Sequence, residues 1–254
     1  MWVGDSFFVL ENLVLKDFRI RYRNMSLGVL WSVLNPIVLM GVLTFIFTMV
    51  FPNPNIKNYP AFVLCGLVPY SFFTVAWISG TTSVVDSASL VKRVPMPRVI
   101  VPIAAVLSNC LHLLIQVLLL LSAVMLFGGH ITVQWLWLPV VWMLEIVFVC
   151  GLALITSTMN VYVRDTRYLV ESANTVLFWL VPIFYSFEVI PPRFSEIYQF
   201  NPVAALVLCL RNILLAAAPP QASTFAKLGG VSFATFALGL LVFHRGKNAF
   251  YDHI

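Results

Sequence analysis

Residues 61–98 read AFVLCGLVPYSFFTVAWISGTTSVVDSASLVKRVPMPR, an apolar run followed at once by a basic segment. The run over 61–84 contains no charged side chain, and about 20 apolar residues suffice for a helix to cross a bilayer core of about 30 Å. Lys and Arg in short loops are retained in the cytoplasm during membrane insertion. The basic segment 86–98 therefore predicts the cytoplasmic end of a membrane helix.

The segment 86–98 also carries helix signals of its own. Asp86 or Ser87 can cap a short helix, and a proline at position 95 stops it. Lys92 and Arg93 complement the negative end of the helix dipole. We predict a short cytoplasmic helix between two spans, with a plain turn as the alternative.

Apolar runs of similar length recur along the rest of the chain. Inside lipid every backbone group must be bonded within the protein, which selects helices. We therefore predict an all-α polytopic membrane protein, with a single transmembrane domain over 1–254. Its six predicted spans are 30–51, 61–84, 99–127, 137–159, 169–188 and 222–243.

The 15 Lys and Arg residues divide unequally between the two sides that six spans define. If both termini lie on one side, the other side holds only Lys57, Arg193, Arg211 and Lys227, the last at a span edge. The positive-inside rule then predicts a multi-pass protein of the bacterial inner membrane with both termini in the cytoplasm. The cytoplasmic set is Lys16, Arg19, Arg21, Arg23, Lys92, Arg93, Arg98, Arg164, Arg167, Arg245 and Lys247.

Composition and motifs argue against a soluble domain and against an enzyme. Hydrophobic residues make up 61% of the chain and charged residues 10%, compared with roughly 25% charged residues in soluble domains. The sequence has no G-x-x-x-x-G-K-[ST], H-E-x-x-H or G-x-S-x-G, so we expect no catalytic residue and no cofactor in this chain. The four cysteines are widely spaced, and we expect no metal. A net charge of +5 suits anionic lipid headgroups better than nucleic acid.

Residues 5–27 precede the first predicted span and are amphipathic. Apolar side chains recur at spacings of three and four, and most basic ones fall on the opposite face. Arg21 falls near the apolar stripe, where its guanidinium would have to snorkel. We predict a basic helix lying in the membrane interface, with an ordinary solvated helix as the alternative. Its basic residues are Lys16, Arg19, Arg21 and Arg23.

Residues 189–220 are moderately apolar but are interrupted by prolines. The two proline-free pieces, about 193–200 and 203–217, are each too short to cross the membrane comfortably. We predict two re-entrant half-helices that enter the external leaflet and turn back. Such pieces survive only where protein or a water-filled cavity covers them.

Polar side chains are sparse within the spans. Asn109, His112 and Gln116 share one face of the span 99–127. They either line a substrate path or form hydrogen bonds that hold the bundle together. Glu171 follows Arg167 by four residues, which predicts a structural ion pair.

Aromatic residues make up 14% of the chain and gather near the external end of the fifth span. Because sugar rings stack their C–H faces on aromatic planes, these side chains are candidates to line a path for sugars. Packing and anchoring are the alternative roles for aromatic residues in membrane helices. The candidates are Trp179, Phe184, Tyr185, Phe187, Phe194 and Tyr198.

The order of several short motifs resembles a known family. The motifs are RYRNMSLG at 21–28, WSVLNP at 31–36, GLVP at 66–69, LVKRVPMPR at 90–98, NVYVRD at 160–165, PIFY at 182–185 and NP at 201–202. Together they are similar to the membrane subunits of ABC exporters for cell-surface polysaccharides, and most of all to O-antigen permeases. The resemblance covers nearly the whole chain. Met25, Ser26 and Thr166 depart from the usual pattern without threatening it.

The resemblance implies how such a chain assembles. It implies a homodimer above two separate ATPase subunits, which bind the ATP and Mg that this chain does not. It implies that 86–98 is a coupling helix and that 189–220 forms an external gate. The residues implied to dock on the ATPase are Leu90, Val91, Lys92, Arg93 and Arg98.

The resemblance also implies the cargo, a lipid-linked polysaccharide such as O-antigen on undecaprenyl diphosphate. The basic side chains of 5–27 then either bind the diphosphate or only hold the helix to anionic membrane lipids. The alternatives are export of teichoic acid, capsule, or a small lipid or drug by the same fold. A membrane accessory of a glycan synthase is the alternative outside transport.

Overall fold

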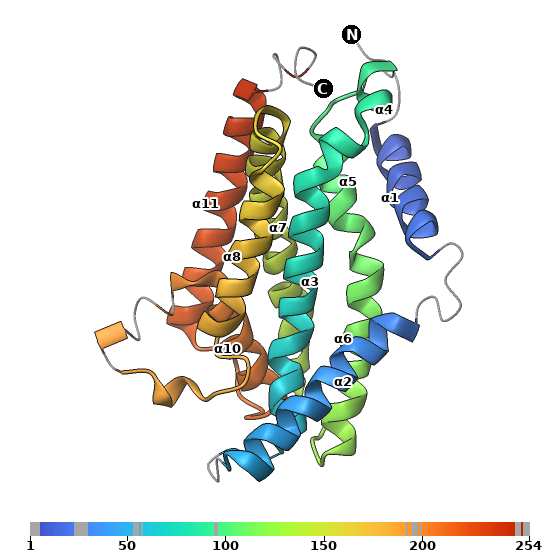
Figure 1. Ribbon diagram of the computed structural model, residues 1–254. Coiled ribbons are helices and arrows are strands. Elements are labelled where there is room, and N and C mark those ends of the chain that lie inside the picture. The colour runs from blue at the N-terminus through green and yellow to red at the C-terminus, as the bar shows by residue number, and fades with distance from the viewer. Residues whose placement is uncertain are drawn as a thin grey trace.

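The computed structural model describes residues 6–22, 30–52, 56, 58–93, 96–191, 193–194, 198, 200–246 and 250. Every regular element within these ranges is a helix, which confirms the predicted all-α fold (Figure 1). The long helices lie side by side, and α2 crosses them obliquely at the end of the bundle that is opposite to α4.

The helices of the described residues are bounded as follows. The N-terminal half contains α1 (Ser6–Tyr22), α2 (Trp31–Phe45), η2 (Ile46–Val50), α3 (Tyr59–Asp86), α4 (Ala88–Arg93), α5 (Ile100–Ser108) and α6 (Cys110–Leu126). The C-terminal half contains η3 (Val133–Trp137), α7 (Leu138–Tyr162), α8 (Thr166–Leu180), η4 (Phe187–Val189), α10 (Pro202–Leu214) and α11 (Ala222–Gly246).

Most of the predicted spans correspond to helices of membrane-crossing length. The described helices that are long and apolar enough to cross are Trp31–Val50, Tyr59–Asp86, Ile100–Leu126, Val133–Tyr162 and Ala222–Gly246. The remaining predicted span, 169–188, is a shorter helix, because α8 ends at Leu180. Val181 is extended, with ψ 135°, since the ring of Pro182 disfavours the helical conformation in the preceding residue.

The span predicted over 99–127 is interrupted at one residue, Asn109, in its first half. One helix ends at Ser108 and the next begins at Cys110. The side chains of Ser108 and Asn109 both donate hydrogen bonds to the carbonyl of Ala105, at 2.9 and 2.7 Å. Short polar side chains that bond to their own backbone compete with the helix ladder, which accounts for a break at this position.

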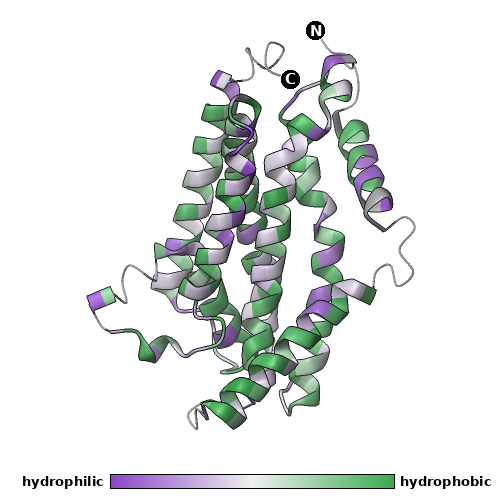
Figure 2. Cartoon of the chain, viewed as in Figure 1, coloured by the Kyte–Doolittle hydropathy of each residue, from purple (hydrophilic) through white to green (hydrophobic). Residues whose placement is uncertain are grey.

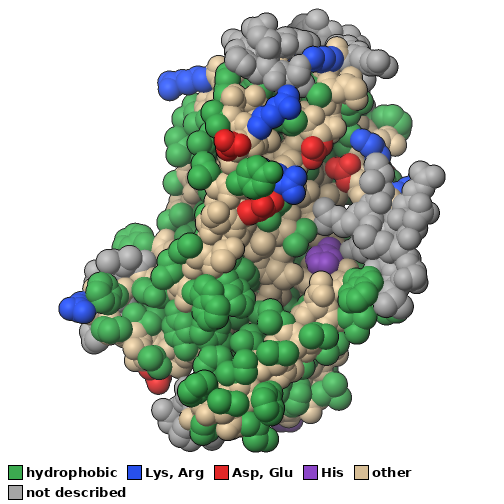
Figure 3. Space-filling model, in the orientation of Figure 1, with side chains coloured by type: hydrophobic (Ala, Val, Ile, Leu, Met, Phe, Trp, Pro, Cys, Tyr) green, Lys and Arg blue, Asp and Glu red, His purple; other side chains and the backbone are tan. Residues whose placement is uncertain are grey.

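The two ends of the bundle differ in charge. Figure 1 places α4 and the last turns of α11 at the same end of the bundle. In Figure 3 most of the visible Lys and Arg side chains gather at this same end, whereas apolar side chains dominate the rest of that face. Figure 2 shows apolar residues along the length of the long helices. This distribution matches the charge asymmetry from which the topology was predicted.

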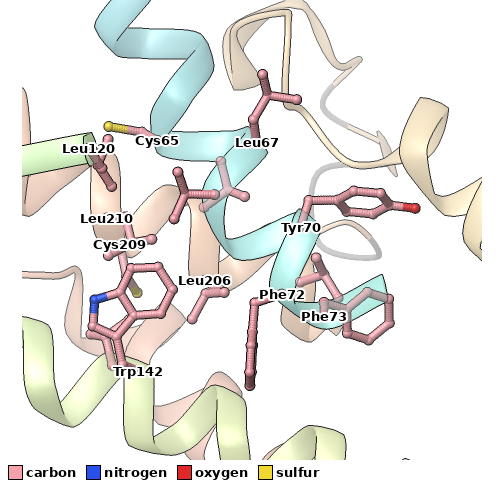
Figure 4. Close-up of a cluster of buried hydrophobic side chains, with 14 of the residues drawn as sticks. Cys65, Leu67, Tyr70, Phe72, Phe73, Leu120, Trp142, Leu206, Cys209 and Leu210 are labelled. Atoms are coloured by element: carbon pink, nitrogen blue, oxygen red, sulfur yellow. The ribbon is translucent and has the colours of Figure 1, made fainter. Parts of the chain in front are cut away.

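Helix α3 forms the centre of the bundle. In its most apolar stretch 72% of residues are buried, compared with 6% in the stretch formed by α2 and η2. Its side chains meet those of α7 and α10, as Figure 4 shows for Phe72, Trp142 and Leu206. Helix α2 therefore lies at the edge of the bundle, while α3, α7 and α10 share one core.

Helices α7 and α11 approach each other at a pair of glycines. A Cβ atom placed on Gly239 would lie 2.5 Å from the carbonyl oxygen of Gly151, and one placed on Gly151 would lie 2.6 Å from the backbone nitrogen of Phe236. Small residues let membrane helices pack with their backbones in contact. The two glycines therefore set the distance between α7 and α11.

Substituting Gly239→Ala should push α11 away from α7, because the new methyl group meets backbone and not a movable side chain. We expect a loss of about 1–3 kcal/mol, the usual cost of overpacking, measured as a lower unfolding temperature in detergent. Gly229→Ala on the same helix is the matched control, since open space surrounds that position. A Gly239→Ala protein as stable as the Gly229→Ala protein would show that the close approach is unimportant.

Candidate functional site

Helix α4 lies at the basic end of the bundle and presents only part of the predicted docking surface. Lys92 is exposed and Leu90 and Arg98 are half-buried. Val91 is 3% exposed and packs in a cluster with Val84, Val101 and others, so its docking role stays a prediction. A helix this close to the bundle turns one face inward, and Val91 is on that face. The side chain of Arg93 lies outside the described residues.

The basic helix α1 packs against α5 at the same end of the bundle. Among its described side chains Leu13 is the most buried, and Leu10 and Val14 pack in the same cluster, so the buried face includes part of the predicted apolar stripe. Lys16 and Arg19 are exposed. The side chain of Arg21 and all of Arg23 lie outside the described residues. The role of these cations stays a prediction.

The polar residues of the third span form hydrogen bonds between helices. The Nδ1 atom of His112 lies 2.7 Å from the hydroxyl of Ser32 on α2, and Gln116 donates to the carbonyl of Ser32 at 3.2 Å. Gln116 also donates to the hydroxyl of Ser71 on α3 at 3.2 Å. Asn109, between α5 and α6, is fully buried and donates to the carbonyl of Ala105 on α5. These contacts favour the bundle-holding alternative, and the path-lining role stays a prediction.

The structure places some of the predicted aromatic residues in contact with one another. Phe184 is the hub, with its ring centroid 5.4 Å from that of Trp179 and 5.2 Å from that of Tyr185. Trp179 is 64% exposed on α8, and Phe194 is exposed beside the guanidinium of Arg193. Phe187 and Tyr198 are half-buried. Aromatic rings therefore gather near the C-terminal end of α8, and whether sugars pass along them stays a prediction.

Other rings of this cluster were missed in the sequence. Phe47 of η2 stacks on Phe184 with centroids 5.5 Å apart, and Phe178 of α8 lies 6.0 Å from the same ring. Tyr59 of α3 stacks on Phe47 at 5.9 Å. These partners are far from Phe184 in the sequence, apart from Phe178, and spacing alone gives no signal for them.

Residues 181–186, which we name the strap, follow α8 in an irregular path between α3 and α10. The hydroxyl of Tyr59 donates to the carbonyl of Phe184 at 2.7 Å. Arg211 of α10 donates through Nη2 to the carbonyl of Ile183 at 2.7 Å and through Nη1 to that of Tyr185 at 3.5 Å. The strap is thus held by side-chain donors from two other helices. A lone Arg within the apolar run VAALVLCLRNILL was the sequence signal for this contact, because a charge there is costly without a function.

The predicted ion pair between Arg167 and Glu171 is confirmed. The Nε atom of Arg167 lies 2.9 Å from a carboxylate oxygen of Glu171. Both side chains are well exposed, 56% and 38%, so the pair adds little to stability.

Comparison with known proteins assigns the chain to a family. Residues 10–215 match the family described as ABC-2 type transporter. The chain belongs to this ABC-2 family. The matching region runs from α1 to the end of α10, so it includes α4, the polar contacts of the third span and the strap.

Relatives of this ABC-2 chain carry names from polysaccharide export. The O-antigen export system permease protein RfbA of Klebsiella pneumoniae is 30% identical over 214 residues, which cover 84% of this chain and 82% of that protein. RfbA of Myxococcus xanthus is 27% identical over 248 residues, covering 97% and 95%. The polysialic acid transport protein KpsM of Escherichia coli is 22% identical over 245 residues, covering 94% of each.

Substituting Gln116→Leu tests the polar contacts of the third span. If Gln116 holds α6 to α2 and α3, its loss should lower stability by roughly 0.6 to 2 kcal/mol while the transport rate per assembled complex stays unchanged. Thermal unfolding and a transport assay measure the two quantities. Ser122→Ala on the same helix is the control, because that exposed hydroxyl bonds to the carbonyl of Leu119 in its own helix. Normal stability with slow transport would instead assign Gln116 to the substrate path.

Proposed function

We propose that this chain is the membrane subunit of an ATP-driven exporter that moves lipid-linked polysaccharide across the bacterial inner membrane. The observation that carries the proposal is its similarity to O-antigen export permeases over 84% to 97% of the chain. The concentration of basic side chains beside α4 supports an orientation with both termini in the cytoplasm. O-antigen on undecaprenyl diphosphate is the proposed cargo.

A second copy of the chain completes the proposed transport path. The face of α2 and η2 is apolar and largely uncovered, with Val38 and Phe45 each 61% exposed. The outer face of α8 is similar, with Trp179 64% exposed. We propose that two copies meet so that α2 and α8 flank a path between them, where the aromatic cluster around Phe184 offers stacking surfaces to sugar rings.

Energy enters through two separate ATPase subunits, which bind ATP and Mg in this proposal. Helix α4 is the proposed contact, because it lies at the basic end of the bundle and exposes Lys92. With Val91 turned inward, the docking surface consists of Leu90, Lys92 and their exposed neighbours. Closure of the ATPase subunits would then displace α4 and the helices joined to it.

The basic face of α1 is the proposed contact for the lipid diphosphate. Lys16 and Arg19 are exposed at the end of the bundle that carries α4. Arginine donates hydrogen bonds to phosphate oxygens in a fixed planar geometry, and lysine acts as a point charge. Both properties suit a diphosphate that enters from the cytoplasmic leaflet.

The proposal is tested by purifying the tagged chain from its source membrane and by deleting its gene. We expect a co-purifying ATPase with a nucleotide-binding loop, and surface polysaccharide that stays inside the deleted strain. Retained capsule or teichoic acid in place of O-antigen would correct the cargo. A chain that purifies with a glycosyltransferase and without an ATPase would overturn the transport function.

Charge reversal at Lys92 tests the docking surface. Lys92→Glu should weaken recovery of the ATPase with the tagged chain, because a rim charge sets electrostatic complementarity with the partner. The amount of ATPase recovered per membrane subunit is the measurement. Lys227→Glu is the control, since Lys227 lies at the opposite end of the bundle on α11. Equal recovery with both variants would exclude Lys92 from the contact.

A further inference from the structure

The strap is a segment of non-helical backbone that passes through the bundle. Val181, Pro182 and Ile183 are buried. Backbone carbonyls inside a membrane protein are costly unless they accept hydrogen bonds from the protein. The carbonyls of three successive residues, Ile183, Phe184 and Tyr185, do so through Arg211 and Tyr59.

Arg211 makes an unusual set of contacts for a buried cation. It is 7% exposed, and its Cζ atom lies 3.5 Å from the centroid of the Phe62 ring on α3. Of the described residues, no carboxylate pairs with it, so carbonyl oxygens and the face of an aromatic ring offset its charge. An apolar side chain of similar size would fill the space without burying a charge. The contacts therefore point to a role beyond filling the core.

These contacts join three parts of the chain at one point. Arg211 belongs to α10, the carbonyls belong to the strap at the end of α8, and Phe62 belongs to α3. Gly66 on α3 provides the slot, because a Cβ there would lie 2.9 Å from the Cα of Ile183. A displacement of α8 along its axis would therefore pull on α10 through the guanidinium.

We propose that Arg211 is a positioning residue that transmits movement of α8 to α10, with Tyr59 as the second tie of the strap. This inference rests on the proposed export function and names the link by which a movement begun at the cytoplasmic end reaches the external side. Arg211 touches no cargo in this role. Because its guanidinium is planar and carries donors on two terminal nitrogens, one side chain can donate hydrogen bonds to two carbonyls of the strap.

The test uses the full exporter with its ATPase, purified and reconstituted in vesicles, and in parallel in cells. Arg211→Met removes the hydrogen-bond donors and keeps much of the side-chain volume. Arg211→Lys keeps the positive charge but lacks the planar guanidinium that donates to two carbonyls. Tyr59→Phe removes only the hydroxyl bond to the carbonyl of Phe184. Arg245→Met is the matched control, because Arg245 is an exposed arginine in the last turn of α11, away from the strap and the aromatic cluster.

We expect the Arg211→Met complex to assemble and to hydrolyse ATP at close to the native rate. Polysaccharide exported per ATP hydrolysed should fall roughly tenfold or more, since hydrogen bonds from a charged donor are the stronger ones. Arg211→Lys should lie between native and Arg211→Met, and Tyr59→Phe should show a smaller loss. Arg245→Met should behave as native.

Several results would overturn the inference. One is native export per ATP by Arg211→Met, and another is a loss of export and of ATP hydrolysis in the same proportion, which marks a structural role only. If Arg211→Met fails to assemble, Arg211→Lys and Tyr59→Phe decide, and native export per ATP by both overturns the inference. If the native chain exports no glycan, the proposed function and this inference are overturned together. If the native chain exports glycan and the Arg211→Met chain exports as much per ATP, only the inference is overturned.

Discussion

A backbone that lies in a bilayer must find its hydrogen-bond partners inside the protein, and this constraint organises the whole chain. Where the sequence permits a helix, the helix ladder satisfies the constraint. Where Pro182 ends α8, the chain continues as the strap, and side chains from α3 and α10 take over as donors. Because the helix ends at this point, Tyr59 and Arg211 are needed as donors to the strap carbonyls. The absence of a side chain at Gly66 leaves room for the backbone of the strap at Ile183.

The bundle divides into a packed part and a sparsely covered part. Helices α3, α7 and α10 share a continuous core, and α11 lies in backbone contact with α7. Helix α2 contacts the bundle through polar contacts at Ser32 and through Met40 and Leu43, and η2 adds ring contacts at Phe47. An exporter needs some helices that keep their relative positions and others that change them. In the proposed exporter we give the first role to α3, α7 and α10, which are well buried, and the second to α2 and α8, which expose much of their surface.

The sequence predicted the features that depend on one segment at a time. Run length and charge gave the spans around α3, α7 and α11 and the end at which basic residues gather, and the spacing of Arg167 and Glu171 gave their ion pair. Contacts between distant segments were not predictable from spacing. The inward face of Val91 depends on how α4 folds back on the bundle, and the partners of Arg211 lie on the strap and on α3. The early end of α8 was readable in principle, because Pro182 restricts Val181.

The meeting of Gly151 and Gly239 has a consequence for how the last helix varies over evolution. Because the backbones of α11 and α7 are in contact at Gly151 and Gly239, selection at these two positions acts on the absence of a side chain. Residues such as Phe233, Leu238 and Leu241 are well exposed on the outer surface of α11. Apolar residues of different shape can replace one another at these positions without changing the crossing. These exposed positions of α11 should therefore vary quickly over evolution, whereas the two glycines should hardly vary.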